Sequence, residues 1–323
     1  MLTIRVIGRQ LRAIQHQLGR ACWASLDFVQ RRLQSHVPKV ISVTKGAVAA
    51  KSRKKLCLFA HYDRNNIIDD YVIYYLEQLH AANFETIVVS TSEELSSSSI
   101  ERARPFCREI VVRENVGYDF GSWKVSLEHA GYLSAYECLL LANDSVYGPL
   151  SDLTEFLEAM QGGNLDACGA TDSFQIRYHV QSYFLVFQPA VFLSECFARY
   201  WTELPYYRFK KTVIWNCELG LSQRLSRAGF RLGALIEYKT LKQSHRTAVD
   251  QAESKLFMRR PVNPTLHLWK LLISDYGFPC VKAELLRDNP KKIESVQNWY
   301  EFLGQTTGYN VDLISQHLAR MRR

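Results

Sequence analysis

Short apolar runs alternate with helix-like segments along most of the chain from residue 56 onward. Residues 71–82 repeat apolar side chains at helical spacing, between runs that read as buried strands. The four runs predicted to be strands are 56–60, 86–92, 109–115 and 138–142. Strand, loop and helix in this order predict an α/β fold with a mostly parallel sheet, whose ligand loops follow the carboxyl ends of the strands.

Polar side chains follow the fourth predicted strand directly. Asn143, Asp144 and Ser145 stand at its end, before a Gly-Pro break. A lone carboxylate at such a strand tip can hold a magnesium or manganese ion that is otherwise bound by phosphate and water, so Asp144 is a candidate metal ligand. An Asx turn that caps the next helix, which opens at Ser151 and Asp152, would explain the same residues.

The other predicted strands also end in polar groups. Gly117, Asp119 and Gly121 precede a further helix, where glycine lets the backbone approach a ligand and Asp119 suits a sugar hydroxyl. Their spacing is neither a P-loop nor a dinucleotide fingerprint, which argues against kinases and dehydrogenases. A simple helix cap at Asp119 or Ser122 is the alternative. The remaining strand-end groups are His61, Tyr62, Asp63, Arg64, Ser90, Thr91 and Asn115.

Charge is concentrated at the start of the chain. The first 55 residues carry twelve Lys or Arg and one acidic residue, a net +11, whereas the rest sums to −3. A nearly neutral body argues against nucleic-acid binding. Apolar and Arg stripes from Ile4 onward predict a basic amphipathic helix, which could lie on an anionic membrane surface, pack on the protein or pair with another chain. It is too interrupted to span a bilayer, and no signal peptide is evident.

Composition places the protein in a reducing compartment. The 323 residues are 47% hydrophobic, typical of globular proteins, and the eight cysteines include no CxxC pair. This argues for cytoplasmic localisation and against zinc or disulfides. We expect a basic helical segment and linker over residues 1–50 and one domain over 51–323, divided into halves at 51–150 and 151–300.

Three segments resemble the rhamnan synthesis protein F family, bacterial glycosyltransferases of cell-surface polysaccharide assembly. They are NVGYDFGSWK, LLLANDSVYGPL and NPTLHLWKLLISDYGFPCVKAELLRDNP, and the resemblance spans about Lys55 to Tyr300. It implies a GT-A type, Rossmann-like fold, a nucleotide-sugar donor, typically dTDP-L-rhamnose, and a growing glycan as acceptor. GT-A enzymes usually carry an Asp-x-Asp metal motif where Asn143, Asp144 and Ser145 stand, and the first position here is Asn.

The resemblance gives the polar residues at the strand ends expected roles in donor and acceptor binding. The acceptor is expected at the loop that precedes a predicted long strand over 178–188, where aromatic faces stack on sugar rings, although a surface hairpin would look similar. The acceptor-binding candidates are Gln175, Arg177, Tyr178 and His179. The donor-binding candidates are His61, Tyr62, Asp63, Asn115, Gly117, Asp119, Lys124, Asn143, Asp144, Ser145 and His245. Further cations for the diphosphate are Arg64, Lys242 and Arg246.

Glu218 is the first candidate for the catalytic base and Asp172 the second. Glu218 opens a predicted helix, where many inverting GT-A enzymes place a carboxylate that takes the proton of the acceptor hydroxyl. A favourable interaction with its own helix dipole is the alternative. We expect transfer to a lipid-linked glycan, such as a lipopolysaccharide O-antigen, at the inner face of the cytoplasmic membrane. A catalytically silent glycan or nucleotide-sugar binding component and a transferase with another donor sugar remain alternatives.

The carboxyl-terminal part is expected to be structural, with a contribution to the acceptor groove as the alternative. Residues 263–290 offer apolar side chains for a core, with Lys282, Glu284 and Arg287 in a capped turn or an interface. The last helix carries Arg320, Arg322 and Arg323, which are expected to be solvated or to join the amino-terminal helix at a membrane.

Overall fold

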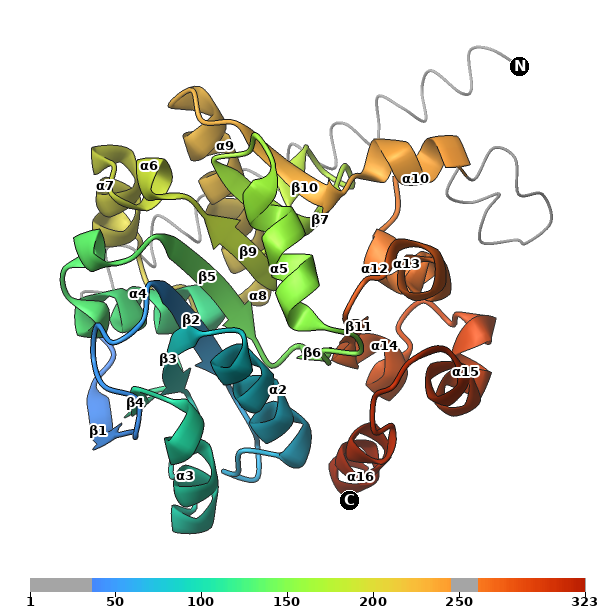
Figure 1. The fold of residues 1–323 in the computed structure, drawn as a ribbon, viewed down its shortest axis with the longest axis horizontal. Coiled ribbons are helices and arrows are strands. Elements are labelled where there is room, and N and C mark those ends of the chain that lie inside the picture. Colours follow the sequence, from blue (N-terminus) through green and yellow to red (C-terminus); the bar gives the residue numbers. More distant parts are fainter. Residues whose placement is uncertain (1–36, 245–260, 323) are drawn as a thin grey trace.

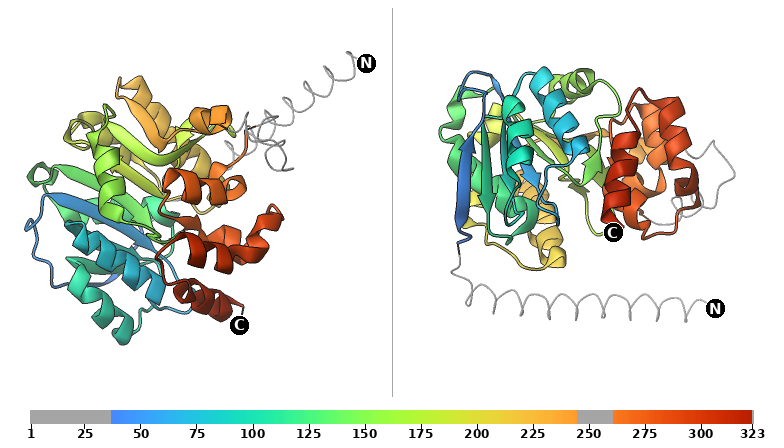
Figure 2. Two further views of the ribbon diagram at one scale, coloured as in Figure 1. Left: turned by 45° about the vertical axis from the view of Figure 1, so that its right-hand side comes forward. Right: turned by 90° about the horizontal axis from the view of Figure 1, so that it is seen from below.

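A computed structural model describes residues 37–244 and 261–322 (Figures 1 and 2). They form an α/β domain around a sheet in the strand order β1-β4-β3-β2-β5-β9-β7-β10, with β8 paired to β7. The strands are β1 (Val40–Lys45), β2 (Lys55–His61), β3 (Phe84–Ser90), β4 (Glu109–Arg113), β5 (Cys138–Asn143), β7 (Ala167–Ser173), β8 (His179–Val180), β9 (Phe184–Phe187) and β10 (Leu232–Ile236).

The sheet is mostly parallel. β2 pairs in parallel with β3 and β5, β3 with β4, and β7 with β10. The strand β9 runs antiparallel between β5 and β7, and β1 runs antiparallel to β4 at one edge. The predicted α/β class, a Rossmann-like and mostly parallel sheet flanked by helices, is confirmed.

Helices cover both faces of the sheet because its central strands are apolar on both sides. Leu56 and Leu58 pack in one cluster with Trp123 of α4, while Cys57 and Phe59 pack on the opposite face with helix α2. The helices are α2 (Asp70–Ala81), α3 (Ser97–Ala103), α4 (Tyr118–Ala130), α5 (Leu153–Gly162), α6 (Pro189–Phe192), α7 (Glu195–Glu203), α8 (Lys210–Val213), α9 (Leu219–Arg227) and α10 (Tyr238–Ser244).

The carboxyl-terminal helices form a group along one side of the domain, drawn in orange to red in Figures 1 and 2. They are α12 (Pro264–His267), α13 (Trp269–Tyr276), α14 (Ala283–Asp288), α15 (Trp299–Thr306) and α16 (Asp312–Met321). A two-stranded sheet joins this group to the rest of the domain, since β11 (Val281–Lys282) pairs antiparallel with β6 (Val146–Tyr147), which follows β5. The segment over residues 263–290, which sequence analysis treated as structural, is therefore attached next to Asn143, Asp144 and Ser145.

Two elements differ from the sequence prediction. Residues 40–45, expected in a segment separate from the domain, form the edge strand β1, since the β-branched run VISVT suits a strand despite its basic surroundings. The predicted long strand over 178–188 divides into β8 and β9, because β8 pairs with β7 alone before the chain turns. The turn, residues 181–183, contacts Glu218 and Lys282 through Ser182 and Tyr183.

The predicted basic amphipathic helix falls within residues 1–36, outside the described residues. Over 37–244 and 261–322, no helix is both long enough and apolar enough to cross a membrane.

Candidate functional site

Asn143 ties the first turn of α4 to the strand-end triplet. Its amide nitrogen donates to Asp119 Oδ2 at 2.8 Å. Its amide oxygen accepts from the backbone N–H of Ser145 at 3.2 Å and from the Ser145 hydroxyl at 2.6 Å. Asn143 is buried, while Asp119 and Ser145 remain partly exposed. The structure thus brings Asp119, Asn143 and Ser145 together, and the amide serves as a connector whose polar groups are already used.

Asp144 faces the loop that follows β2. Its Oδ2 accepts from the backbone N–H of Tyr62 at 2.8 Å, and its backbone carbonyl accepts from the Tyr71 hydroxyl at 3.1 Å. Burial raises the pKa of Asp144 well above its usual range, and the charges of Asp119 and Asp63 raise it further. Burial raises the pKa of Asp119 as well, against its hydrogen bond from Asn143. A cation in this region would relieve the cost of holding both carboxylates ionised.

Lys282 supplies such a cation, and sequence analysis did not identify it as a site residue. In the β6–β11 pair it lies opposite Val146, so its side chain reaches the triplet. Its Nζ donates to Ser145 Oγ at 3.3 Å and lies 3.8 Å from the centre of the Tyr183 ring. Burial lowers the pKa of Lys282 to about 8, while the charges of Glu218 and Asp119 act in the opposite direction.

Glu218 is held by Ser182, the residue before Tyr183, and its charge acts on the pKa values of both Tyr183 and Lys282. It ends a π-helical turn (Ile214–Glu218) that leads into α9, and such turns occur often at functional sites. Its Oε1 accepts from the backbone N–H of Ser182 at 2.9 Å and from the Ser182 hydroxyl at 3.0 Å. The side chain is partly exposed. The β8–β9 turn therefore anchors the Glu218 carboxylate with Ser182 and places Tyr183 beside the ammonium of Lys282.

Asp172 is close to this turn but more enclosed. Its Oδ1 accepts from the backbone N–H of Tyr238 at 2.6 Å, and only 3% of the residue is exposed. Burial raises its pKa to about 6, and the charge of Glu237 adds to the rise. Because Glu218 is open to solvent and Asp172 is not, Glu218 is the better placed of the two to meet an acceptor hydroxyl.

Several donor candidates at the first strand are used for internal contacts. His61 bonds Ser90 Oγ through Nδ1 at 2.9 Å. Asp63 is held by Arg320 of α16, and Arg64 donates to the carbonyl of Met321. The Tyr62 ring, which is 52% exposed, stays free to meet a ligand. The structure therefore brings the backbone of this loop to Asp144, while His61 and Asp63 brace the loop.

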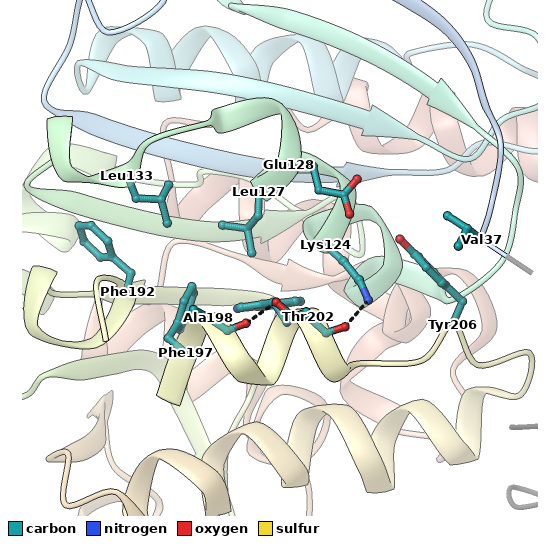
Figure 3. A pocket seen from close by; sticks show the side chains of 11 residues that line it. Val37, Lys124, Leu127, Glu128, Leu133, Phe192, Phe197, Ala198, Thr202 and Tyr206 are labelled. Atoms are coloured by element: carbon teal, nitrogen blue, oxygen red, sulfur yellow. Dashed lines mark hydrogen bonds between the residues drawn. The ribbon is translucent and has the colours of Figure 1, made fainter. Parts of the chain in front are cut away.

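Lys124 lies at a different place from the strand-end groups. Its Nζ donates to the carbonyls of Thr202 at 3.1 Å and Leu204 at 2.8 Å. It lines a largely apolar groove of about 430 Å³ between α4 and α7, together with Trp201 and Tyr206 (Figure 3). The structure does not bring Lys124 together with Asp144 and Glu218.

The remaining candidates are spread over two places. Asn115 is exposed, and Gly117 takes a φ of +91° at the start of α4, where a Cβ would come within 2.9 Å of Tyr206. In the acceptor loop, the Tyr178 hydroxyl donates to Leu232 O at 3.4 Å. Gln175 and Arg177 are exposed, and His179 Nδ1 bonds the carbonyl of Arg177 at 2.8 Å. His245 and Arg246 lie outside the described residues.

The strand-end donor set fits a resident divalent cation poorly. Within the described part of the chain, no group of three or more His, Cys, Asp or Glu side chains is arranged to hold a metal ion. The amide oxygen of Asn143 already accepts two hydrogen bonds from Ser145. Asp144 is the single carboxylate of the triplet. A magnesium or manganese ion here would depend on oxygens of a bound ligand. The role of Asp144 as a metal ligand stays a prediction.

Stability is expected to fall on acidification because His61 is held neutral. Burial lowers the pKa of His61 to about 4, below the usual value near 6.5. The unfolded chain therefore binds a proton that the folded chain resists, so stability present above pH 6.5 is lost as the pH falls toward 4. This loss amounts to about 2 kcal/mol between pH 7 and pH 5. Urea unfolding of the wild type and of His61→Asn at both pH values measures it. An unchanged pH dependence in the variant would refute this assignment.

Two strand-end carboxylates, a half-buried ammonium and an anchored glutamate form a polar region of this α/β protein, near the edge of the sheet where such folds place their ligands. A sequence model of the family described as rhamnan synthesis protein F matches residues 86–323. The virulence protein VirA of Vibrio anguillarum is 31% identical over 285 residues, covering 79% of this chain and 89% of VirA. The chain belongs to the rhamnan synthesis protein F family, which confirms the resemblance seen in the sequence.

Solved structures overlap the chain more loosely. The galactosyltransferase LgtC with donor and acceptor sugar analogues has a TM-score of 0.39 and 12% identity, over 80% of this chain and 98% of LgtC. Core-mannan synthase A of Aspergillus fumigatus in its Mn/GDP form has a TM-score of 0.36 and 11% identity, over 62% of this chain and 86% of that chain. Scores this low transfer no site and no activity to this chain.

Proposed function

We propose that the protein is an inverting glycosyltransferase of polysaccharide synthesis, of the GT-A type, which uses a nucleotide-sugar donor. Membership of the rhamnan synthesis protein F family supports a glycosyltransferase of this pathway. The observation that carries the mechanism is the partly exposed carboxylate of Glu218, which is anchored by Ser182. The neighbouring Tyr183 contacts Lys282 next to the strand-end triplet. We propose L-rhamnose from dTDP-L-rhamnose as the sugar and a cell-surface glycan, such as a lipopolysaccharide O-antigen, as the acceptor.

The chemistry requires a base and a place for the leaving group. The acceptor hydroxyl oxygen forms a bond to the anomeric carbon while the bond from that carbon to the diphosphate oxygen breaks. Glu218 takes the hydroxyl proton, and the nucleoside diphosphate leaves with the electron pair of the broken bond. Ser182 occupies Oε1, and among the described residues no donor is bonded to Oε2, which can therefore receive the proton.

The donor is proposed to lie across the carboxyl ends of β2 and β5. The carboxylate of Asp119 accepts hydroxyls of the ribose or sugar, and the exposed ring of Tyr62 is available for stacking. The acceptor is proposed to enter beside Gln175, Arg177, Tyr178 and His179. We further propose that the acceptor is lipid-linked and that the basic segment over residues 1–36 contacts the cytoplasmic membrane surface.

Nucleotide-sugar binding is the direct test of this function. A ligand that binds only the folded state raises its stability, by about 2.7 kcal/mol at a concentration of 100 Kd. We therefore expect dTDP-L-rhamnose to raise Tm by several degrees and transfer to a glycan acceptor to follow. A panel of dTDP-, UDP- and GDP-sugars, with and without manganese or magnesium, identifies the donor.

The outcomes of this test separate the alternatives. Saturable binding with no product from any acceptor would contradict the enzyme and favour a catalytically silent binding component. Absence of any shift across the panel would remove the nucleotide-sugar site altogether.

A further inference from the structure

We propose that the ammonium group of Lys282 binds the diphosphate of the donor directly and stabilises it as the leaving group. The inference rests on the proposed function, and it adds a residue of the carboxyl-terminal segment to the donor site. It also supplies the cation that the poor metal-ligand set at Asn143, Asp144 and Ser145 does not hold.

The backbone fixes Lys282 beside the strand-end triplet. Lys282 pairs with Val146 in the β6–β11 sheet, and the next residue, Ala283, donates its N–H to the carbonyl of Ser145 at 3.0 Å. Main-chain contacts thus join Lys282 and Ala283 to Val146 and Ser145. The ammonium is therefore positioned by the fold rather than by a flexible loop, as preorganised charge stabilisation requires.

The partners of the ammonium are neutral. Its contacts are the Ser145 hydroxyl at 3.3 Å and the face of Tyr183 at 3.8 Å. Two other enclosed cations of the described chain have direct carboxylate partners: Arg108 pairs with Glu85 at 2.9 Å, and Arg320 pairs with Asp69 at 2.8 Å. The buried Arg113 instead donates to several backbone carbonyls, whereas Lys282 has a single hydroxyl as its hydrogen-bond partner within the part of the chain that the structure describes. Among the described residues, no carboxylate lies within ion-pair distance of Lys282 Nζ. The charges of Glu218 and Asp119 favour the ammonium without a direct ion pair, so part of its desolvation cost remains, and a bound anion offsets that cost.

The neighbouring carboxylates are not direct ion-pair partners of Lys282. Asp119 accepts from the Asn143 amide and Asp144 from the Tyr62 backbone, so each carboxylate is already held by a neutral donor. Glu218 is held by Ser182, the residue before Tyr183. The Ser145 hydroxyl donates its single proton to Asn143 Oδ1 and accepts from Lys282 Nζ, so the ammonium is the group here that can donate its further N–H bonds to a phosphate oxygen.

Equilibrium binding of a nucleoside diphosphate tests the inference without turnover. The probes are dTDP and UDP, titrated calorimetrically into the full chain in EDTA and again with manganese. We expect binding by the wild type in EDTA, and a Kd at least about tenfold higher in Lys282→Met and Lys282→Gln. Lys282→Arg should recover most of the affinity, because it restores the charge. The dependence of Kd on salt should also weaken in the two neutral variants.

Controls distinguish this inference from a folding defect and from the proposed function. Lys54→Met removes an exposed lysine at the opposite end of β2 and should bind like the wild type. Native Tm in Lys282→Met or Lys282→Gln excludes unfolding as the cause. Wild-type affinity in both neutral variants, or wild-type binding that requires manganese, overturns the role of Lys282 while transfer persists. A wild type that binds neither probe and transfers no sugar overturns the proposed function, and the role of Lys282 with it.

Discussion

Glu218→Gln is expected to lower the turnover of sugar transfer by about 10²–10⁴-fold, the contribution of a positioned general base. Glutamine keeps an oxygen that can accept from the Ser182 backbone and hydroxyl, so the β8–β9 turn and α9 should remain in place. Its amide cannot take the hydroxyl proton. We therefore expect kcat to fall while the affinity for the donor and the Tm stay near wild-type values. Steady-state kinetics combined with calorimetric donor binding separates these quantities.

Two further variants complete this experiment. Glu195→Gln changes an exposed glutamate of α7 and should leave transfer unchanged. Asp172→Asn tests the second candidate, whose enclosed carboxylate is bonded to the Tyr238 backbone, and a smaller loss of kcat is expected. Full turnover in Glu218→Gln together with loss in Asp172→Asn would exchange the roles of the two residues.

Arg320→Ala is expected to destabilise the protein by about 3 kcal/mol. The guanidinium in α16 binds both Asp63 and Asp69, whose side chains are only 6% and 11% exposed. Removing one partner leaves two enclosed carboxylates unpaired, which costs 3–5 kcal/mol in fully buried sites, and the 23% exposure of Arg320 places the value at the low end. The expectation that this arginine is solvated or membrane-bound is corrected by these ion pairs.

Loss of the Arg320 ion pairs should also weaken donor binding at the proposed site. Next to Arg320 on α16, His317 bonds the Tyr147 hydroxyl at 2.7 Å, and both rings pack on Tyr71, whose hydroxyl holds the Asp144 carbonyl. Urea unfolding and donor affinity are therefore measured together. Arg322→Ala, at an exposed position directly after the end of α16, is the matched control. Equal stability of both variants would contradict the bracing role of Arg320.

The central sheet could be predicted because its strands carry their own signal. The runs at 56–60 and 138–142 are apolar without interruption, as strands buried on both faces must be, and they form β2 and β5. Polar residues after β5 pointed to the strand-end site for the same reason, because the apolar pattern stops abruptly at Asn143. Glu218 could be singled out by its position before an amphipathic helix, and its role as a base stays a prediction.

Lys282 and Arg320 could not be identified from local pattern. Lys282 reaches Ser145 only through strands of two residues each, a length at which hydrophobic alternation cannot be recognised. The ion pairs of Arg320 join residues more than 250 positions apart, and its own helix shows only that it lies on a polar face. The break between β8 and β9 was also hidden, since Tyr183 and Val180 continue the apolar pattern across the turn.

The pairing of β6 with β11 determines when Lys282 can reach the strand-end triplet during protein synthesis. The strands that carry Asp144 are made before the midpoint of the chain, but Lys282 and its partner strand follow much later. Contacts between residues so far apart in sequence form slowly, because the entropy of closing the intervening loop is lost first. A nascent chain can therefore build its parallel strands β2 to β5 early, and it brings Lys282 to Ser145 only later, because the two residues are 137 positions apart.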